Sequence, residues 1–259
     1  MRIESFLINT VSFTFGKKRF QKFFRKLLSI SLRGLNYGNL GFGEGHALDY
    51  ILSKSNDGSQ RIIFDVGANI GEYSEMILKR EDSNVLIYAF EPAKITFQTL
   101  VKNQNLIKVI KENIGLGSSE GEMKLYRQSE SSPLASVFQR DFKGQRFEVF
   151  DIVKIETIDI FCLERDIEKI HFAKIDVEGF EMEVLKGAEK MIKANKIIYI
   201  QFEFGGTQIN SRTFFKDFWE FLSPYYKISR ILKDGFEEII EYNERLEIFG
   251  YSNYLCELK

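Results

Sequence analysis

The sequence predicts an α/β fold in which helices cover both faces of a seven-stranded, doubly wound and mostly parallel sheet. Two observations lead to this prediction. Short apolar segments alternate with segments of helical periodicity, which is the pattern of successive βαβ units. The last two apolar segments, 225–232 and 251–258, have no helical stripe between them, so we expect an antiparallel pair at the edge of the sheet.

Three runs rich in β-branched and aromatic residues begin the predicted sheet. RIIFDV, NVLIYAF and LIKVIKEN predict strands over 61–66, 84–90 and 106–113. The segments after the first two runs repeat apolar residues three and four positions apart, as a helix with one buried face does. They predict helices over 69–80 and 94–104.

The alternation resumes after a polar stretch that contains two short β-like pieces, at 122–126 and 147–155. Asp159 lies near the start of the next helical segment, and we expect it to be the N-cap. The remaining strands are expected over 171–177, 196–204, 225–232 and 251–258, and the remaining helices over 157–166, 180–195 and 211–222.

A basic N-terminal extension precedes this domain. Residues 16–33 carry apolar side chains at 20, 23, 24, 27 and 28, the spacing of one helix face, and residues 1–35 hold eight basic residues against one acid. Two interpretations stay open: a surface helix docked on the core, or a basic helix lying on an anionic membrane. The five glycines of 34–45 predict a loop, and we divide the chain into 1–58 and 59–259.

Composition excludes several classes of protein. The net charge of -1 gives no overall attraction to nucleic acid, and Cys162 and Cys256 lack the spacing of metal ligands. The sequence has no run of 18 apolar residues and no apolar signal-peptide core. We therefore expect a cytoplasmic protein, which is membrane-associated if the basic helix binds a membrane.

The segment FDVGANIGEYS, at 64–74, is a strand that runs into a glycine-rich turn. A phosphate-binding P-loop needs Lys and Ser or Thr after its last glycine, but Gly71 is followed by Glu72. A dinucleotide-binding turn needs a middle glycine where this sequence has Asn69. Because Asp65 adds a negative charge, a cationic or zwitterionic ligand fits this turn better than a pyrophosphate.

Glu91 ends the second predicted strand, 20 residues after Gly71. An acid at this place accepts hydrogen bonds from the hydroxyls of a ribose. We therefore predict a ribose-bearing cofactor. Two candidates remain at this point: S-adenosylmethionine, which carries a sulfonium, and NAD, which carries a pyrophosphate.

In an open α/β sheet, ligands bind outside the carboxyl ends of the strands. Most residues that directly follow the predicted strands are polar or glycine, and we expect them to face one crevice. They are Asp65, Gly67, Ala68, Asn69, Gly71, Glu91, Pro92, Asn113, Ile114, Asp176, Glu178, Gly179, Glu203, Gly205 and Gly206.

Several segments, taken in order, resemble the FkbM-type methyltransferases. They are FDVGANIGEYS, AFEP at 89–92, NIGLGSSEGEMKLY at 113–126, ETIDIF at 156–161 and KIDVEGFEMEVLKGAE at 174–189. The similarity covers about 60–204, continues weakly to 253–255, and outside this range includes GEG at 43–45. The resemblance implies a class I enzyme with a Rossmann-like sheet, which uses S-adenosylmethionine to O-methylate sugars, glycans or natural products.

The resemblance also implies a set of cofactor-binding residues. They are Asp65, Gly67, Ala68, Asn69, Gly71, Glu91, Pro92, Asn113, Ile114 and Asp176. The glycine-rich turn would line the methionine part of the cofactor, with Asp65 holding the turn or the amino group. Glu91 would bind the ribose, and Asn113 and Ile114 would flank the adenine.

Methyl transfer to a hydroxyl needs a base that removes the proton. The candidates are Asp176, Glu178, Glu203 and His46. Asp176 comes first because it ends the fourth strand at the centre of the crevice, whereas Glu178 has an equal alternative role as a cap of the next helix. His171 begins the same strand, at the opposite end of the sheet, and is expected to be structural.

No metal site is predicted, because no pattern shows that Asp176, Glu178 and Glu203 converge. The polar stretch 127–146 is either a lid over the acceptor or a plain surface loop. We predict methyl transfer from S-adenosylmethionine to a hydroxyl of a sugar or glycan, an acceptor class that rests on the resemblance, with no nucleic-acid partner. The alternatives are an NAD-dependent oxidoreductase and a non-enzymatic scaffold or membrane-surface protein.

Overall fold

The computed structural model describes residues 9–13, 15–38, 43–54, 60–81, 84–127, 135–138, 141–142, 145–146 and 149–259. The chain forms two compact units, Met1–Asn39 and Leu40–Lys259. The second unit begins earlier than the boundary that the sequence predicted between residues 58 and 59, because helix α3 (Glu44–Lys54) belongs to this unit. α3 packs into the hydrophobic core of that unit through Ala47, Leu48 and Ile51.

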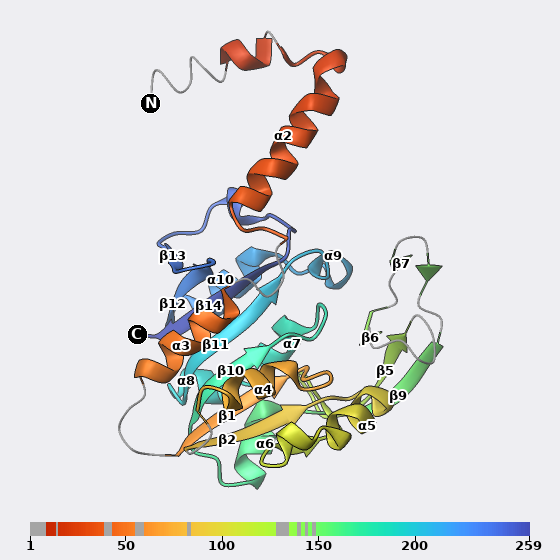
Figure 1. Cartoon of the computed structure of the whole chain (residues 1–259), viewed down its shortest axis with the longest axis vertical. Helices are drawn as coiled ribbons and strands as arrows, with labels where there is room; N and C mark the ends of the chain where they lie inside the picture. Colours follow the sequence, from red (N-terminus) through yellow and green to blue (C-terminus); the bar gives the residue numbers. More distant parts are fainter. Residues whose placement is uncertain are drawn as a thin grey trace. The chain divides into compact units, whose positions relative to one another are not determined.

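The second unit is built on one eight-stranded sheet with the order β13-β12-β14-β11-β10-β1-β2-β3 (Figure 1). In chain order, its strands are β1 (Arg61–Val66), β2 (Val85–Phe90), β3 (Ile110–Glu112), β10 (Ile170–Ile175), β11 (Ile197–Phe204), β12 (Tyr226–Ile231), β13 (Phe236–Ile239) and β14 (Ser252–Leu258). β1 is parallel to β2 and β10, and β14 is antiparallel to β11 and β12. The predicted α/β class with a mostly parallel sheet is therefore confirmed.

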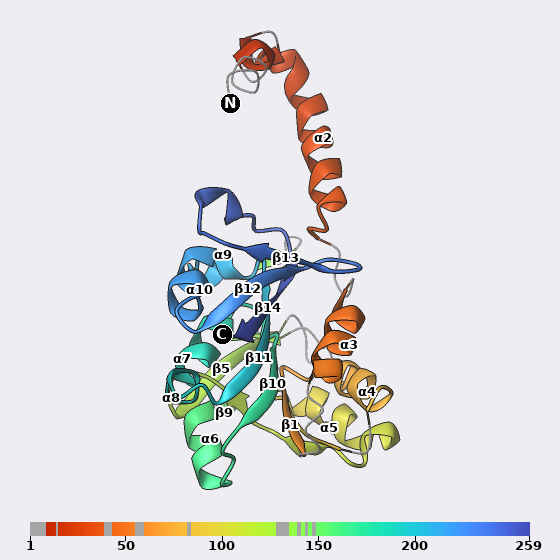
Figure 2. The same cartoon turned by 90° about the vertical axis from the view of Figure 1, so that its left-hand side faces the viewer.

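Helices cover both faces of this sheet. α3, α4 (Glu72–Leu78) and α5 (Lys94–Lys102) lie on one face (Figure 2). The opposite face carries α6 (Ile158–Glu164), α7 (Glu181–Lys186), α8 (Glu189–Lys193), α9 (Gln208–Ser211) and α10 (Phe215–Leu222). Each helical layer encloses its own hydrophobic core, with Leu48 and Ile77 in the first and Phe161 and Phe218 in the second.

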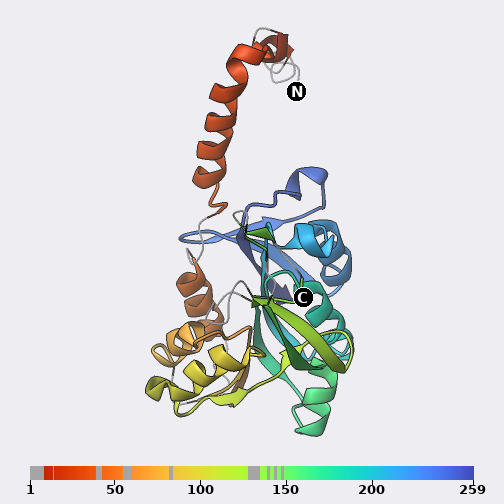
Figure 3. The ribbon, with the colours of Figure 1, turned by 90° about the vertical axis from the view of Figure 1, so that its right-hand side faces the viewer.

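A second, four-stranded sheet is inserted in the chain between β3 and α6 (Figure 3). It has the order β4-β9-β5-β6, with β4 (Gly115–Leu116), β5 (Gly121–Arg127), β6 (Ala135–Ser136) and β9 (Val149–Glu156), while β7 (Asp141–Phe142) and β8 (Gln145–Arg146) pair separately. The β-like pieces predicted at 122–126 and 147–155 are thus β5 and β9, paired antiparallel. Much of the polar stretch 127–146, expected to be either a lid or a plain surface loop, lies outside the described residues.

Several predicted elements are shorter or divided in the structure. The expected strand 106–113 starts with the end of a 3-10 helix, η2 (Gln104–Leu106), so β3 keeps three residues. The expected helix 180–195 is two helices, separated at Gly187 and Ala188. The last two predicted strands, now β12 and β14, pair antiparallel as expected, but β13 adds an eighth strand outside them and forms the edge.

The predicted N-cap of α6 is wrong. α6 begins after Thr157, whose hydroxyl accepts a hydrogen bond from the backbone N–H of Ile160 at 3.1 Å. Asp159 lies in the first turn of α6, and its carboxylate accepts hydrogen bonds from the backbone N–H groups of Lys190 and Met191, at 2.9 and 3.0 Å. Asp159 therefore caps the start of α8 and fastens it to α6.

The N-terminal unit contains η1 (Lys18–Phe20) and α2 (Gln21–Gly34), within the helix expected at 16–33. α2 ends where Asn36 takes a left-handed φ of 68° and the N–H of Tyr37 donates back to the carbonyl of Leu32 at 2.8 Å. None of the helices in the described parts of the chain has the length and hydrophobicity needed to span a bilayer.

The predicted loop over 34–45 is only partly a loop. Gly34 is the last residue of α2 and Glu44 the first of α3, and the candidate base His46 lies in the first turn of α3. Residues 39–42, between these two helices, lie outside the described part of the chain.

Asp159→Ala should lower the free energy of unfolding by about 1 kcal/mol, because it removes the acceptor of two backbone donors at the start of α8. Asp159→Asn keeps one oxygen acceptor and should give an intermediate value. Urea unfolding followed by circular dichroism measures both free energies. Equal stability of the wild type and Asp159→Ala would show that this cap does not stabilise the fold.

Candidate functional site

Two rows of polar side chains cross the large sheet at the carboxyl ends of its parallel strands. In the first row, Asp65 of β1 pairs with Lys174 of β10, which pairs with Gln201 of β11. Side chains alternate between the two faces of a strand, so residues two positions further point to the same face. The second row therefore contains Asp176 and Glu203, on the face that α3 and α4 cover.

The turn after β1 lies against the end of β10. Gly67 has a φ of 81°, and a Cβ there would be 1.9 Å from the backbone oxygen of Asp176, so only glycine fits. The backbone N–H groups of Gly67 and Ala68 donate to the carbonyl of Phe90 at 3.0 and 2.9 Å. Asn69 also has a left-handed φ, 51°, which Asn tolerates better than most residues. The turn thereby joins the ends of β1, β2 and β10.

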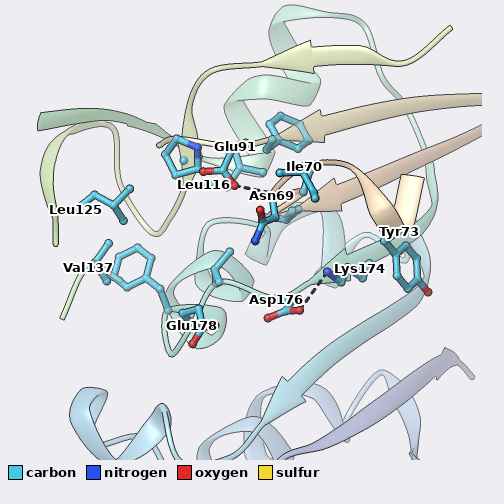
Figure 4. A pocket seen from close by; sticks show the side chains of 18 of the residues that line it. Asn69, Ile70, Tyr73, Glu91, Leu116, Leu125, Val137, Lys174, Asp176 and Glu178 are labelled. Atoms are coloured by element: carbon cyan, nitrogen blue, oxygen red, sulfur yellow. Dashed lines mark hydrogen bonds and ion pairs between the residues drawn. The ribbon is translucent and has the colours of Figure 1, made fainter. Parts of the chain in front are cut away.

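Glu91 follows β2 and faces this turn (Figure 4). One carboxylate oxygen accepts a hydrogen bond from the backbone N–H of Asn69 at 3.0 Å, and the other accepts one from Ala93 at 2.8 Å. The side-chain amide of Asn113 donates to the Glu91 carbonyl at 2.8 Å. Burial raises the pKa of Glu91 to about 7. Each carboxylate oxygen has a second lone pair, with which it can accept a hydrogen bond from a ligand hydroxyl.

Lys174 is a buried cation that faces the carboxylates of Asp176, Asp65 and Glu44. Its Nζ lies 3.2 Å from Asp176 Oδ2, 3.9 Å from Asp65 Oδ1 and 5.2 Å from the centre of the Tyr73 ring. Burial disfavours the charged lysine, but the three carboxylates outweigh burial and raise the pKa of Lys174. Lys174 therefore carries a full charge at neutral pH.

The first residue of α3 completes the charged end of the site. Glu44 Oε1 accepts hydrogen bonds from the side-chain amides of Gln201 and Asn253, at 3.3 and 3.1 Å. The hydroxyl of Tyr73, from α4, donates to the Gln201 amide oxygen at 3.2 Å. Burial raises the pKa of Glu44. Side chains from two helices and two strands thus fix one another around Lys174.

A cavity of about 580 Å³ lies in front of these residues, a volume typical of small-molecule sites. Its other side is apolar and comes mainly from the second sheet. The apolar lining residues of that sheet are Leu116, Leu125, Val153 and Ile155. Figure 4 shows Leu116, Leu125 and Val137 on one side of the cavity, and Lys174 and Asp176 on the other. The cavity therefore has an apolar end and a charged end.

Carboxylates outnumber cations around this cavity. Its acidic lining residues are Glu44, Glu72, Glu91, Asp176 and Glu178, and within the described lining Lys174 is the one cation. In the part of the chain that the structure describes, no group of three or more His, Cys, Asp or Glu side chains is placed to hold a metal ion. The excess of acids favours a positively charged ligand and disfavours a pyrophosphate.

Glu181, rather than Glu178, organises the loop after β10. Its Oε1 accepts hydrogen bonds from the backbone N–H groups of Val177 and Gly179, at 3.0 and 3.1 Å, and its Oε2 accepts one from Gln208 at 2.6 Å. Burial raises the pKa of Glu181 to about 7. α7 has no side-chain N-cap, so the alternative role of Glu178 as that cap is not found; Glu178 lines the cavity instead.

The cavity brings together about half of the residues expected at the site. Those that line it are Gly67, Ala68, Asn69, Glu91, Pro92, Asp176 and Glu178. Those that do not are Asp65, Gly71, Asn113, Ile114, Gly179, Glu203, Gly205, Gly206 and His46. Gly115 and Leu116 line it close to the place expected for Asn113 and Ile114. Asp65 lies below the cavity floor, fully buried, where Oδ2 accepts a hydrogen bond from Ser74 at 2.7 Å.

Two of the four candidate bases lie behind or beside the cavity. Glu203 is buried, and burial together with the charges of Asp176, Glu181 and Glu178 raises its pKa to about 9. The ring of His46 packs 5.4 Å from the ring of Phe236, at the edge strand β13. His171, expected to be structural, accepts a hydrogen bond from the backbone N–H of Ile62 at 3.1 Å.

Lys174, Glu44, Tyr73 and the apolar side of the cavity were not identified from the sequence. Lys174 could have been found, because it lies two positions before Asp176 in a strand and therefore points to the same face. The apolar side of the cavity could not have been predicted from the sequence, because it depends on how the second sheet lies over the first.

A family described as "Methyltransferase FkbM domain" matches residues 65–238. The match begins in the first polar row and includes the glycine-rich turn, Glu91 and Asp176. The chain belongs to the FkbM methyltransferase family. The resemblance read from the motifs is thereby confirmed, and the cavity described above is the candidate active site of an FkbM methyltransferase.

Two curated relatives carry names that describe methyltransferases. The FkbM chain is 27% identical over 167 residues to the hexuronic acid methyltransferase AglP of Haloferax volcanii. This alignment covers 63% of the present chain and 64% of AglP. It is 28% identical over 145 residues to methyltransferase 1 of Beauveria bassiana. This second alignment covers 49% of the present chain and 58% of that protein. The chain thus matches less than two thirds of the length of each.

Solved structures of other methyltransferases align with most of the chain at low identity. A putative rRNA-methylase from Clostridium thermocellum has a TM-score of 0.45 and 11% identity, covering 85% of this chain and 97% of its own. The precorrin-6y C5,15-methyltransferase from Geobacter metallireducens has a TM-score of 0.41 and 10% identity, covering 82% and 87%.

The buried carboxylates should make the ligand-free protein less stable as the pH rises. The folded-state pKa values of Glu91 and Glu181, about 7, and of Glu203, about 9, lie above the ordinary glutamate pKa of 4.5. The folded state therefore binds more protons than the unfolded state, and the free energy of unfolding falls as these groups ionise. Of these three carboxyl groups, Glu203 continues the fall above about pH 7.

Thermal unfolding of the wild type and of Glu203→Gln, followed between about pH 5 and pH 9, measures this effect. Glu203→Gln should flatten the curve above about pH 7, whereas Glu220→Gln, at an exposed helix position, should leave it unchanged. Parallel curves for the wild type and Glu203→Gln would contradict the assignment.

Proposed function

We propose that this FkbM methyltransferase binds S-adenosylmethionine in the cavity and transfers its methyl group to a hydroxyl of a sugar or glycan. The charge of the cavity is the observation that carries the proposal. Five carboxylates and one lysine line it, and this balance attracts a sulfonium cation, whereas the pyrophosphate of NAD would add negative charge to an acidic site.

The residues around the cavity fit the parts of this cofactor. Glu91 offers carboxylate lone pairs for the two ribose hydroxyls. The apolar end, with Leu116 and Leu125, suits the flat adenine ring. At the other end, the turn around Gly67 would hold the methionine part, and Lys174 is the lining cation that suits its carboxylate.

S-adenosylmethionine, when bound, supplies a methyl group that its sulfonium has already activated. The protein therefore has to align the acceptor hydroxyl and accept its proton. Asp176 suits this role best, because its side chain is 36% exposed, lines the cavity and is fixed by Lys174 at 3.2 Å. The hydroxyl proton would pass to the Asp176 carboxylate as the new C–O bond forms and the C–S bond breaks.

The other candidate bases fit this role less well. A pKa of about 9 keeps Glu203 protonated at neutral pH, so it would donate a hydrogen bond rather than accept a proton. His46 packs on Phe236 outside the cavity lining. Glu178, which lines the cavity, is the second choice and would contact the acceptor.

A sugar acceptor is supported by the polar lining and by one relative. Glu44 and Glu178 offer carboxylate oxygens at the end of the cavity where Asp176 lies, and such oxygens accept hydrogen bonds from sugar hydroxyls. The relative AglP is named as a methyltransferase of a hexuronic acid, which is a sugar derivative.

Isothermal titration calorimetry tests the cofactor. S-adenosylhomocysteine should bind the wild type, and NAD should not. Glu91→Gln should weaken binding by roughly tenfold or more, because a charge-assisted hydrogen bond is lost. Glu72→Gln, an exposed acid at the same cavity, should change the affinity only a few-fold. Binding of NAD without S-adenosylhomocysteine would overturn the proposal.

Asp176→Asn should lower methyl transfer by on the order of a hundredfold to ten-thousandfold, because amides do not accept protons from alcohols. Its affinity for S-adenosylhomocysteine should stay within a few-fold of the wild type. Transfer of a radiolabelled methyl group to sugar nucleotides and glycan extracts measures turnover, with Glu72→Gln, an exposed carboxylate at the same cavity, as the control. Full turnover by Asp176→Asn would show that another residue is the base.

A further inference from the structure

The N-terminal helix α2 has one apolar face and one basic face. Phe20 and the helix residues after it repeat apolar side chains at the spacing of a single helix face, at Phe20, Phe23, Phe24, Leu27 and Leu28. The opposite face carries Lys22, Arg25, Lys26, Ser29 and Arg33. The helix is therefore amphipathic, and all of its charged residues are basic.

Within the N-terminal unit, no described residue buries the apolar face of α2. None of the residues of α2 is buried, and Phe23, Leu28 and Ile30 are 62%, 58% and 59% exposed. Three aromatic rings gather at the start of the helix, with Phe15 lying 5.1 Å from Phe20 and 5.9 Å from Phe24. An apolar surface of this kind marks a contact surface.

The charge around α2 indicates what it contacts. No acid occurs between Glu4 and Glu44, whereas this stretch contains Lys17, Lys18, Arg19, Lys22, Arg25, Lys26 and Arg33. The rest of the chain carries a net negative charge, since the whole chain has -1. These seven basic residues, with no acid among them, give this segment a strong positive charge. A partner that covers it therefore needs both an apolar interior and a negatively charged surface.

We propose that α2 lies on a bilayer of anionic phospholipids, with its apolar face among the acyl chains and its basic face among the headgroups. A bilayer supplies both properties in one plane, and Phe and Leu on one side with Lys and Arg on the other is the composition of interfacial helices. Nucleic acid would match the charge but would leave Phe23, Leu27 and Leu28 in water. A second copy would bring two strongly basic helices together.

This proposal is independent of methyl transfer, because it is tested without cofactor or acceptor. The full-length protein is mixed with vesicles of phosphatidylcholine containing phosphatidylglycerol, or of phosphatidylcholine alone, and the bound fraction is measured by co-sedimentation. The wild type should bind the anionic vesicles much more tightly than the neutral ones, and added salt should weaken this binding.

The combined variant Lys22→Gln, Arg25→Gln, Lys26→Gln should bind the anionic vesicles on the order of a hundredfold more weakly, at roughly fivefold per charge. The matched control removes three exposed lysines from helical segments of the other unit: Lys79→Gln, Lys193→Gln, Lys216→Gln. This control should bind like the wild type.

A second variant, Leu27→Ser with Leu28→Ser, tests the apolar face, and it should bind more weakly although its charge is unchanged. Thermal unfolding shows whether the second unit stays folded in each variant. The proposal is overturned if the protein binds neutral and anionic vesicles equally, or if the control variant loses as much binding as the α2 variants. It is also overturned if the protein binds no vesicles and instead self-associates through α2.

Discussion

The candidate site depends on one buried charge, the ammonium group of Lys174. An unpaired charge in a protein interior is very costly, and so is a buried carboxylate without a counter-ion. Asp65, Asp176 and Glu44 each face this lysine from a different element, so the four groups offset one another's burial. Lys174 thereby links the ends of β10 and β1 to the start of α3.

The two ends of the cavity come from different parts of the architecture. The charged end is built on the central strands of the large sheet, where strand register fixes the positions of the side chains. The apolar end is built by the second sheet, a separate insertion in the chain. Asp176, the residue proposed to accept the proton, therefore directly follows a central strand of the large sheet, a kind of position that holds a side chain more precisely than a long loop does.

The sequence predicted what local patterns control and failed where distant segments meet. Strand and helix alternation gave the fold class, and the residue types in the turn around Gly67 and at Glu91 located the cavity. Asp159 was misassigned because its acceptors bind N–H groups of a helix about 30 residues later in the chain. The apolar side of the cavity and the contacts of Lys174 with Asp65 and Glu44 come from long-range packing, which single-sequence patterns do not encode.

The two edges of the large sheet have a consequence for behaviour in solution. An exposed, long edge strand invites pairing with another chain and so promotes aggregation. At one edge, β3 has only three residues, and at the other β13 has four, two of which are glutamates, Glu237 and Glu238. Neither edge offers a long uncharged row of free backbone groups. Short and charged edge strands of this kind disfavour edge-to-edge pairing between copies of the chain.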